Sequence, residues 1–229
     1  LRRYHVLGGE MKDHSTETRR ALFTTEARRT STLCSLQFLG SVFVLVGFFG
    51  PWVAHRTAAL TVTGYELSEF AKFFPQIQSG TVPVRRALFI TPLLAGAISL
   101  ALVVHRSGRG SLLRLGATAL TALLALVALP PFQAILEPQY RAQLILIAGA
   151  LLLTLATPLA RQLSEHARGV LLLLLTLIGA TPALWQTVLL RPLVAQLYQT
   201  VIWPGWGFLV CVIGFLMLLA AGVRSIARA

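Results

Sequence analysis

Acidic residues are scarce in this chain, which has eight Asp and Glu against 20 Lys and Arg in 229 residues. None of the eight lies inside the long apolar runs that make up most of the sequence, and Lys and Arg lie outside these runs or close to their ends, as Arg114 does. Proton and ion pathways through membranes usually need an ionisable group at membrane depth. The composition therefore disfavours an ion-coupled transporter or pump.

Motifs for metal binding and nucleophilic catalysis are also missing. The two cysteines, Cys34 and Cys211, form no CxxC pair or Cys/His cluster, and they are expected at different depths, so neither a zinc site nor a disulfide is predicted. The sequence contains no GxSxG, HExxH or Walker A motif. We therefore predict no catalytic residue and no metal site, and we predict that the protein is not an enzyme.

What the sequence does have is a set of long apolar runs. Residues 169–190 carry no charge, and a helix of that length covers about 30 Å, the thickness of a bilayer's hydrocarbon core. Five similar runs accompany it. The predicted fold class is an all-α, polytopic integral membrane protein with six transmembrane helices, at about residues 34–54, 87–104, 112–132, 142–159, 169–190 and 201–223.

The charges between the runs predict the orientation. With both termini inside, 14 Lys and Arg fall on the inner side and six on the outer side, which follows the positive-inside rule. Residues 1–32 are then a basic cytoplasmic N-terminal segment, and residues 33–229 a six-helix membrane domain with an outer loop at 55–86. The predicted location is the bacterial inner (plasma) membrane. The net charge of +12 follows from this bias. Since the sequence has no basic stripe interleaved with aromatic residues, we predict no nucleic-acid partner.

The outer loop contains a helix-start signal. Thr63 and Glu66 have the spacing of a capping box, and Val62 and Leu67 occupy the positions of a hydrophobic staple. The spacing predicts a short amphipathic helix over residues 64–74, lying on the outer interface between the first two spans. Three phenylalanines on this segment are candidates for docking a partner or covering a cavity, with lipid contact as the equal alternative: Phe70, Phe73 and Phe74.

Aromatic and histidine residues near the span ends supply the other candidates. Trp52 is predicted to be an interfacial anchor, and Trp203 and Trp206 are predicted interface or partner residues. No two histidines face one another at mid-depth, so no cofactor is predicted and lipid contacts are expected. A tetrapyrrole held by a single ring is left open as an alternative, with His105 and His166 as its candidate ligands.

Residues 51–70, PWVAHRTAALTVTGYELSEF, resemble a loop in multi-span membrane proteins of filamentous phototrophic bacteria. The resemblance implies no activity. It does imply a photosynthetic or respiratory membrane complex as the partner.

Three functions compete on this sequence. Surfaces of small residues, such as Ala148–Ala150, and the lack of polar chemistry favour a non-catalytic structural or accessory subunit of a larger membrane complex, with lipids and other subunits as partners. The main alternative is a membrane-spanning permease subunit of a transporter energised by a separate ATPase chain. The third is an intramembrane enzyme acting on lipid through the outer loop, for which the sequence offers no nucleophile.

Overall fold

The computed structural model describes residues 32–55, 60–106, 110–135, 137–199 and 201–228, and most of these are helical. Five helical segments are long and apolar enough to cross a membrane: Thr32–Phe49, Arg86–Arg106, Pro138–Gln162, Glu165–Tyr198 and Trp206–Ile226. A sixth apolar helix, Ser111–Val127, has 17 residues and is shorter. The prediction of a mainly helical, multi-pass chain is confirmed at this level. The predicted N-terminal segment 1–32 lies almost wholly outside the described residues.

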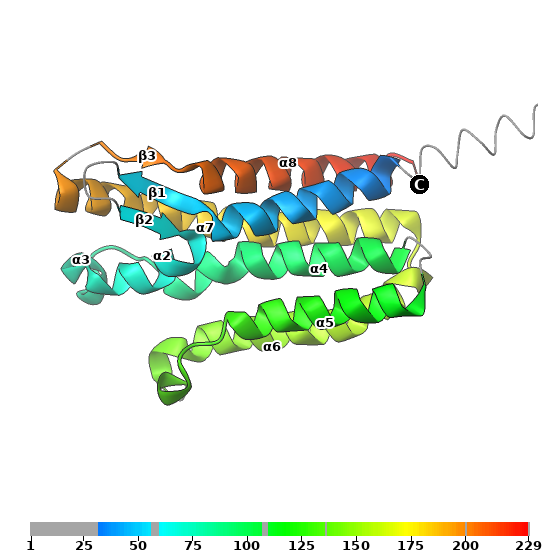
Figure 1. Cartoon of the computed structure of the whole chain (residues 1–229), viewed down its shortest axis with the longest axis horizontal. Coiled ribbons are helices and arrows are strands. Elements are labelled where there is room, and N and C mark those ends of the chain that lie inside the picture. The colour runs from blue at the N-terminus through cyan, green and yellow to red at the C-terminus, as the bar shows by residue number, and fades with distance from the viewer. Residues whose placement is uncertain (1–31, 56–59, 107–109, 136, 200, 229) are drawn as a thin grey trace, which may run out of the picture.

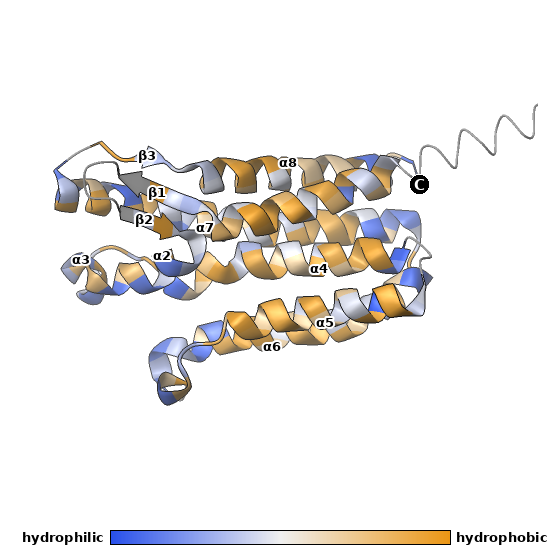
Figure 2. Cartoon of the chain, in the orientation of Figure 1, coloured by the Kyte–Doolittle hydropathy of each residue, from blue (hydrophilic) through white to orange (hydrophobic). Residues whose placement is uncertain are grey.

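The elements run side by side in a bundle (Figure 1). After the Thr32–Phe49 helix come β1 (Pro51–His55), β2 (Leu60–Thr63), α2 (Gly64–Phe70), α3 (Pro75–Gln78), α4 (Thr91–Arg106), α5 (Ser111–Val127), α6 (Arg141–Ala156), α7 (Glu165–Tyr198), β3 (Trp203–Pro204) and α8 (Trp206–Ile226). Short 3-10 turns join them, among them Ala71–Phe73, Arg86–Ile90 and Thr157–Gln162. Figure 2 shows apolar residues along the long helices and hydrophilic ones toward both ends of the bundle. We call these the sheet end, which holds β1–β3, and the basic end, which holds Arg106, Arg161 and Arg168.

Helix α4 forms the centre of the bundle. It packs against α5, α6 and α7, and side chains on all its faces are buried. A helix that is apolar all round is expected to be enclosed in this way. The Thr91 hydroxyl donates to the Gly179 carbonyl of α7 at 2.9 Å, in the turn where Pro182 interrupts the helix hydrogen bonds.

The Thr32–Phe49 helix and α8 approach through glycines on both sides. A Cβ atom added at Gly47 would lie 2.3 Å from the Cys211 backbone nitrogen, and one added at Gly214 would lie 2.6 Å from the Val44 nitrogen. Glycines spaced seven residues apart, at 40 and 47 and at 207 and 214, line this crossing. Small residues at heptad spacing favour close helix packing, so the sequence carries a signal for this crossing.

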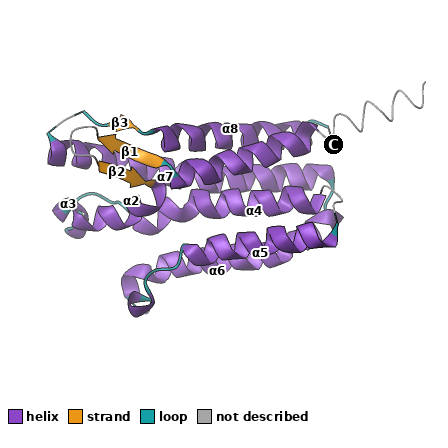
Figure 3. Ribbon diagram, viewed as in Figure 1, coloured by secondary structure: helices purple, strands orange, loops and turns teal. Residues whose placement is uncertain are grey.

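The described residues include three strands, which the all-α prediction omitted. Figure 3 shows them confined to one end of the molecule. They form an antiparallel sheet in the order β2-β1-β3, with Val53 paired with both Val62 and Pro204. The predicted first span, which reached residue 54, is therefore too long: the helix ends at Phe49. Pro51 cannot continue a helix, and the strand pairing then holds the chain extended.

The interfacial role predicted for Trp52 is wrong in this structure. Its side chain is only 1% exposed, and its indole N–H donates to the Gly47 carbonyl at 2.9 Å. The ring meets Phe48 and Phe208 edge to face. Because β1 turns back over the helix ends, Trp52 joins the core of the sheet end.

The capping box predicted at the start of α2 is confirmed. The Thr63 hydroxyl oxygen accepts from the Glu66 backbone N–H at 3.2 Å, and the Glu66 carboxylate accepts from the Thr63 N–H at 2.9 Å. The helix is shorter than predicted, since it ends at Phe70 and continues as a 3-10 turn. Its apolar face packs on the chain's own core through Leu67 and Ala71, which are fully buried.

We expect Thr63→Ala to lower the free energy of unfolding by about 1 kcal/mol, because the first turn of α2 then loses its N-cap acceptor. Thermal denaturation of the purified chain in detergent, followed by circular dichroism, measures the change. Thr61→Ala is the matched control, because Thr61 is exposed on β2. Equal losses of unfolding free energy in Thr63→Ala and Thr61→Ala would show that the N-cap hydrogen bond adds no stability of its own.

Helix α7 corrects a second boundary. The fifth span is predicted to end at residue 190, but α7 is continuous through Tyr198 and contains Pro182 and Pro192. Its 34 residues cover about 50 Å, which exceeds the bilayer core. Two nitrogens of the Arg191 guanidinium donate to the Ile202 carbonyl, at 3.0 and 2.8 Å, and tie the end of α7 to the start of β3.

Candidate functional site

A cavity of about 240 Å³ opens at the basic end, between the Thr32–Phe49 helix, α4, α7 and α8. We call it the basic cavity. Its polar lining consists of Gln37, His105, Arg106, Arg161, Arg168 and Ser225. Its walls are apolar and include Leu33, Leu102 and Leu171. Polar side chains from the Thr32–Phe49 helix, α4, α7 and α8 meet around this space.

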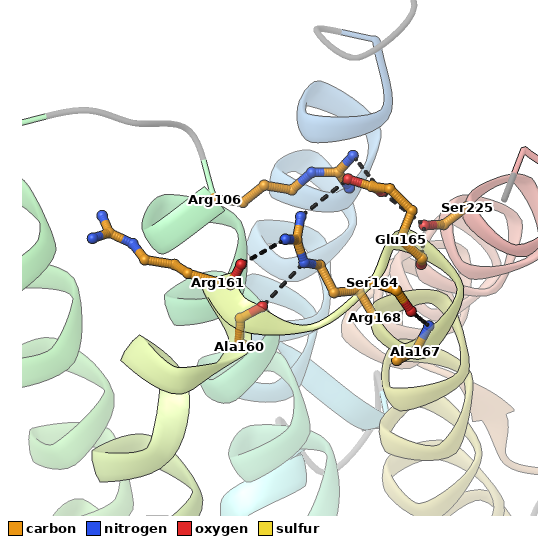
Figure 4. Close-up of polar contacts among 8 residues, drawn as sticks. All are labelled: Arg106, Ala160, Arg161, Ser164, Glu165, Ala167, Arg168 and Ser225. Atoms are coloured by element: carbon orange, nitrogen blue, oxygen red, sulfur yellow. Dashed lines mark hydrogen bonds and ion pairs between the residues drawn. The ribbon is translucent and has the colours of Figure 1, made fainter.

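One carboxylate, that of Glu165, lies among the arginines of this cavity (Figure 4). Arg106 donates to Glu165 Oε2 at 2.8 Å, and Arg168 donates to Glu165 Oε1 at 3.0 Å. The Ser225 hydroxyl of α8 donates to the Glu165 backbone carbonyl at 3.1 Å. Glu165 thus joins α4, α7 and α8. Its side chain is 44% exposed, so these pairs contribute little stability and serve mainly to position the arginines.

Local sequence accounts for this placement. Ser164 is the N-cap of α7, with its oxygen accepting from the Ala167 N–H at 3.2 Å, and Glu165 follows in the first turn, where a negative charge complements the helix dipole. Arg168 lies one turn later and faces Glu165. Arg106 lies in the last turn of α4, where a positive charge is favoured. Opposite charges therefore gather where helix ends of opposite polarity meet.

The three arginines differ in the donors they have left. All three nitrogens of the Arg168 guanidinium are used, by Glu165 and by the carbonyls of Ala160 and Arg161. Among the described residues, Arg106 uses one terminal nitrogen, toward Glu165. Arg161 uses only Nε, toward the His105 carbonyl at 3.1 Å, and Figure 4 shows its terminal nitrogens pointing away from Glu165. Because a guanidinium has five N–H donors, Arg106 and Arg161 keep donors for a ligand.

The two histidine candidates have different positions. His105 is buried and lines the basic cavity, and its Nδ1 lies 2.9 Å from the Ala101 carbonyl at the end of α4. His166 is exposed and is not part of the cavity lining. Within the part of the chain that the structure describes, no group of three or more His, Cys, Asp or Glu could hold a metal ion.

The aromatic candidates lie at the sheet end. Trp203 and Trp206 are 73% and 55% exposed, and Phe73 is 77% exposed, so all three are accessible to a partner. Phe70 is half-buried and meets the rings of Phe73 and Phe74. Phe74 is buried in the chain's own core, which overturns its predicted accessibility. The α2 segment packs its apolar face inward, leaving Phe73 outside.

A second polar cluster, around Tyr140, connects the α2 segment to α6. Lys72 hydrogen-bonds to Glu69 and to the Tyr140 hydroxyl, and Lys72 and Arg86 both lie over the Tyr140 ring, at 5.1 and 5.3 Å from its centroid. Burial disfavours the charged ammonium, but the hydrogen bonds and charge attraction from Glu69 and Tyr140 outweigh it, so the pKa of Lys72 is raised above its ordinary value. Sequence reasoning missed this cluster because Lys72 and Tyr140 are far apart in the chain.

No family model, no curated protein and no solved structure matches this chain. The function proposed below therefore rests on the geometry of this chain alone.

Proposed function

We propose that this protein is a non-catalytic accessory subunit of a larger membrane complex, with six spans and both termini on the cytoplasmic side of a bacterial inner membrane. The arrangement of the chain ends supports the even number of spans. Leu33, at the start of the first helix, and Ser225, at the end of α8, line the same cavity. A chain whose two ends lie on one side of the membrane crosses it an even number of times. Helix α5, despite its 17 residues, therefore counts as a span beside the five longer ones and brings the total to six.

Polar side chains within the helices support a structural role. Many of them hydrogen-bond to helix carbonyls: Gln37, Ser41, Thr91, Thr121, Gln143, Thr154 and Thr176. The Gln37 amide reaches across to the Ser99 carbonyl at 3.2 Å, and the Gln143 amide reaches the Ala128 carbonyl at 2.6 Å. Bonds that reach another helix, such as those of Gln37, Thr121 and Gln143, hold helices together.

The observation that carries the proposal is the pair of unpacked glycines Gly116 and Gly149. A Cβ atom added at any other glycine within the described long helices would lie 3.0 Å or less from an atom of a neighbouring element. At Gly116 on α5 and Gly149 on α6, no atom lies within 4 Å. Glycine costs a helix about 1 kcal/mol relative to alanine, and close helix packing is what compensates for this cost elsewhere in the chain.

Both glycines lie on the hairpin formed by α5 and α6, which packs on α4 and leaves its outer faces free (Figure 1). Large apolar side chains surround them. Leu112 on α5 is 83% exposed, and Ile145 and Leu152 on α6 are 71% and 68% exposed. Lipid chains can cover the exposed leucines. The open space at Gly116 and Gly149, however, is suited to the close approach of another helix. We therefore assign the outer face of this hairpin to a partner subunit.

Gentle solubilisation of native membranes containing the tagged full-length chain tests the proposal. We expect the wild type to migrate on a native gel as part of a larger complex with fixed partners. Gly149→Leu should lose most of the partner, because the added side chain fills the gap. Gly110→Leu is the matched control, since Gly110 also has open space around it but precedes the α5 helix.

A partner that carries pigment or haem would match the photosynthetic or respiratory complex implied by the resemblance of residues 51–70. A co-purifying ATPase with a GxxxxGK[ST] motif would replace the proposal by the permease alternative. Extraction of the wild-type chain from the membrane without any bound partner would refute the proposal.

A further inference from the structure

A second space adjoins the basic cavity. It is an apolar crevice of about 210 Å³ between α4, α6, α7 and the 3-10 turn Thr157–Gln162, and it has almost no polar surface. It shares three wall residues with the basic cavity: Leu102, Ala160 and Leu171. The two spaces are therefore neighbours, one lined with charged side chains and the other apolar.

We infer that these two spaces together form a binding site for an anionic glycerophospholipid, with its phosphate in the basic cavity and an acyl chain along the apolar crevice. This inference rests on the membrane location proposed above and is independent of the partner subunit. Basic pockets between transmembrane helices, at the level of the headgroups, are suited to anionic lipid headgroups.

Charge complementarity identifies the headgroup. Three arginines and one glutamate line or border the basic cavity, so the region keeps a net positive charge. Each nitrogen of Arg168 already donates to a protein acceptor, so Arg106 and Arg161, whose terminal nitrogens are less used, are the main donors for a ligand. Guanidinium groups bind phosphate oxygens with two parallel hydrogen bonds. A headgroup that carries its own cation would meet these arginines unfavourably, so an anionic lipid is preferred over a zwitterionic one.

Size and position favour a lipid over a free phosphate ion. Each space is several times the roughly 30 Å³ that one water occupies, yet neither could enclose a whole lipid. The headgroup and the upper part of one chain fit these volumes. The rest of the chain would continue along exposed side chains at the crevice mouth, such as Leu159, which is 61% exposed. A free phosphate would use the arginines but would leave the crevice empty.

Native mass spectrometry of the full-length protein in detergent tests the site. The protein is incubated with phosphatidylglycerol and phosphatidylcholine that carry the same acyl chains, and bound lipid is counted. We expect at least tenfold preference for phosphatidylglycerol. Arg161→Gln should reduce its retention about tenfold, because charge-assisted hydrogen bonds to the phosphate are lost. Arg141→Gln, an exposed arginine at the start of α6 near the sheet end, is the control and should change nothing.

Two further variants separate binding from folding. Glu165→Gln frees Arg106 and removes a competing charge, so we expect it to increase phosphatidylglycerol retention, an effect that misfolding cannot produce. Ala156→Phe, within the crevice only, should reduce lipid retention while leaving the arginines in place.

Inorganic phosphate serves as the competing ligand. We expect millimolar phosphate to leave lipid retention unchanged. Displacement of the lipid by phosphate, together with wild-type lipid retention in Ala156→Phe, would show that the site binds a free anion. That result would overturn the assignment of a lipid as the ligand. Equal retention of the two lipids, or equal losses in Arg161→Gln and Arg141→Gln, would overturn the site itself. Neither result bears on the partner subunit, which is tested by co-purification.

Discussion

Gly47→Ala is expected to lower the unfolding temperature of the isolated protein sharply, whereas the same substitution at Gly116 is expected to raise it. At Gly47 the added Cβ would lie 2.3 Å from the Cys211 nitrogen and 2.6 Å from the Gly207 carbonyl oxygen. Both are backbone atoms of α8, which cannot rotate out of the way as a side chain does. The two helices must separate, and overpacking of this kind typically costs about 1–3 kcal/mol or more.

At Gly116 no atom lies within 4 Å, so alanine meets no obstacle and α5 gains about 1 kcal/mol of helix propensity. Circular dichroism melts of both variants in the same detergent compare the two effects directly. Gly47→Leu extends the series and should prevent folding. Shifts of the same sign at the two positions would mean that the crossing of the first helix and α8 is looser than the structure places it.

The second large effect is expected from Trp52→Ala. Trp52 is among the largest fully buried side chains of the described residues, and its removal leaves a cavity between Phe48 and Phe208 and an unused Gly47 carbonyl. Large-to-small substitutions of buried aromatics cost about 3–5 kcal/mol. Trp52→Phe should have an intermediate effect, because it keeps an aromatic ring but loses the hydrogen bond.

Trp203→Ala is the matched control, because this tryptophan is 73% exposed at the same end of the molecule. We expect its stability to stay within about 0.5 kcal/mol of the wild type, as is usual for surface positions. Tryptophan fluorescence gives a second measurement: loss of Trp52 should remove the component that emits at the shortest wavelength. A larger effect at Trp203 than at Trp52 would contradict the burial of Trp52 in the core of the sheet end.

Boundaries of the helices show how far sequence reasoning reaches. The span predicted at 142–159 agrees with α6 and the turn after it, and the one predicted at 87–104 agrees with α4 to within about a turn. The predicted end of the first span is wrong by five residues, because an apolar strand such as Pro51–His55 has the same composition as a helix end. The predicted fifth span stops at residue 190, eight residues before the end of α7, because Arg191 and Pro192 have the properties of a helix end.

The candidate site was less accessible to prediction than the fold. His105 was named for its ring, but in the structure its environment is defined by Arg106, Arg161 and Arg168, each of which was counted only as a positive charge on the inner side. The capping serine Ser164 and the adjacent Glu165 could have indicated where α7 begins. Nothing in the chain order indicated that Glu165 meets Arg106, which is 59 residues away.

By itself, the sequence determined the long apolar helices and the capping box at Thr63, because each depends on neighbouring residues alone. Only the tertiary structure decided that β1 pairs with β3, that Trp52 is buried, and that arginines from α4 and α7 surround a cavity next to an apolar crevice. These features join segments that are far apart in the chain. Their energies come from contacts between side chains and backbones brought together by folding, which no local pattern of residues specifies.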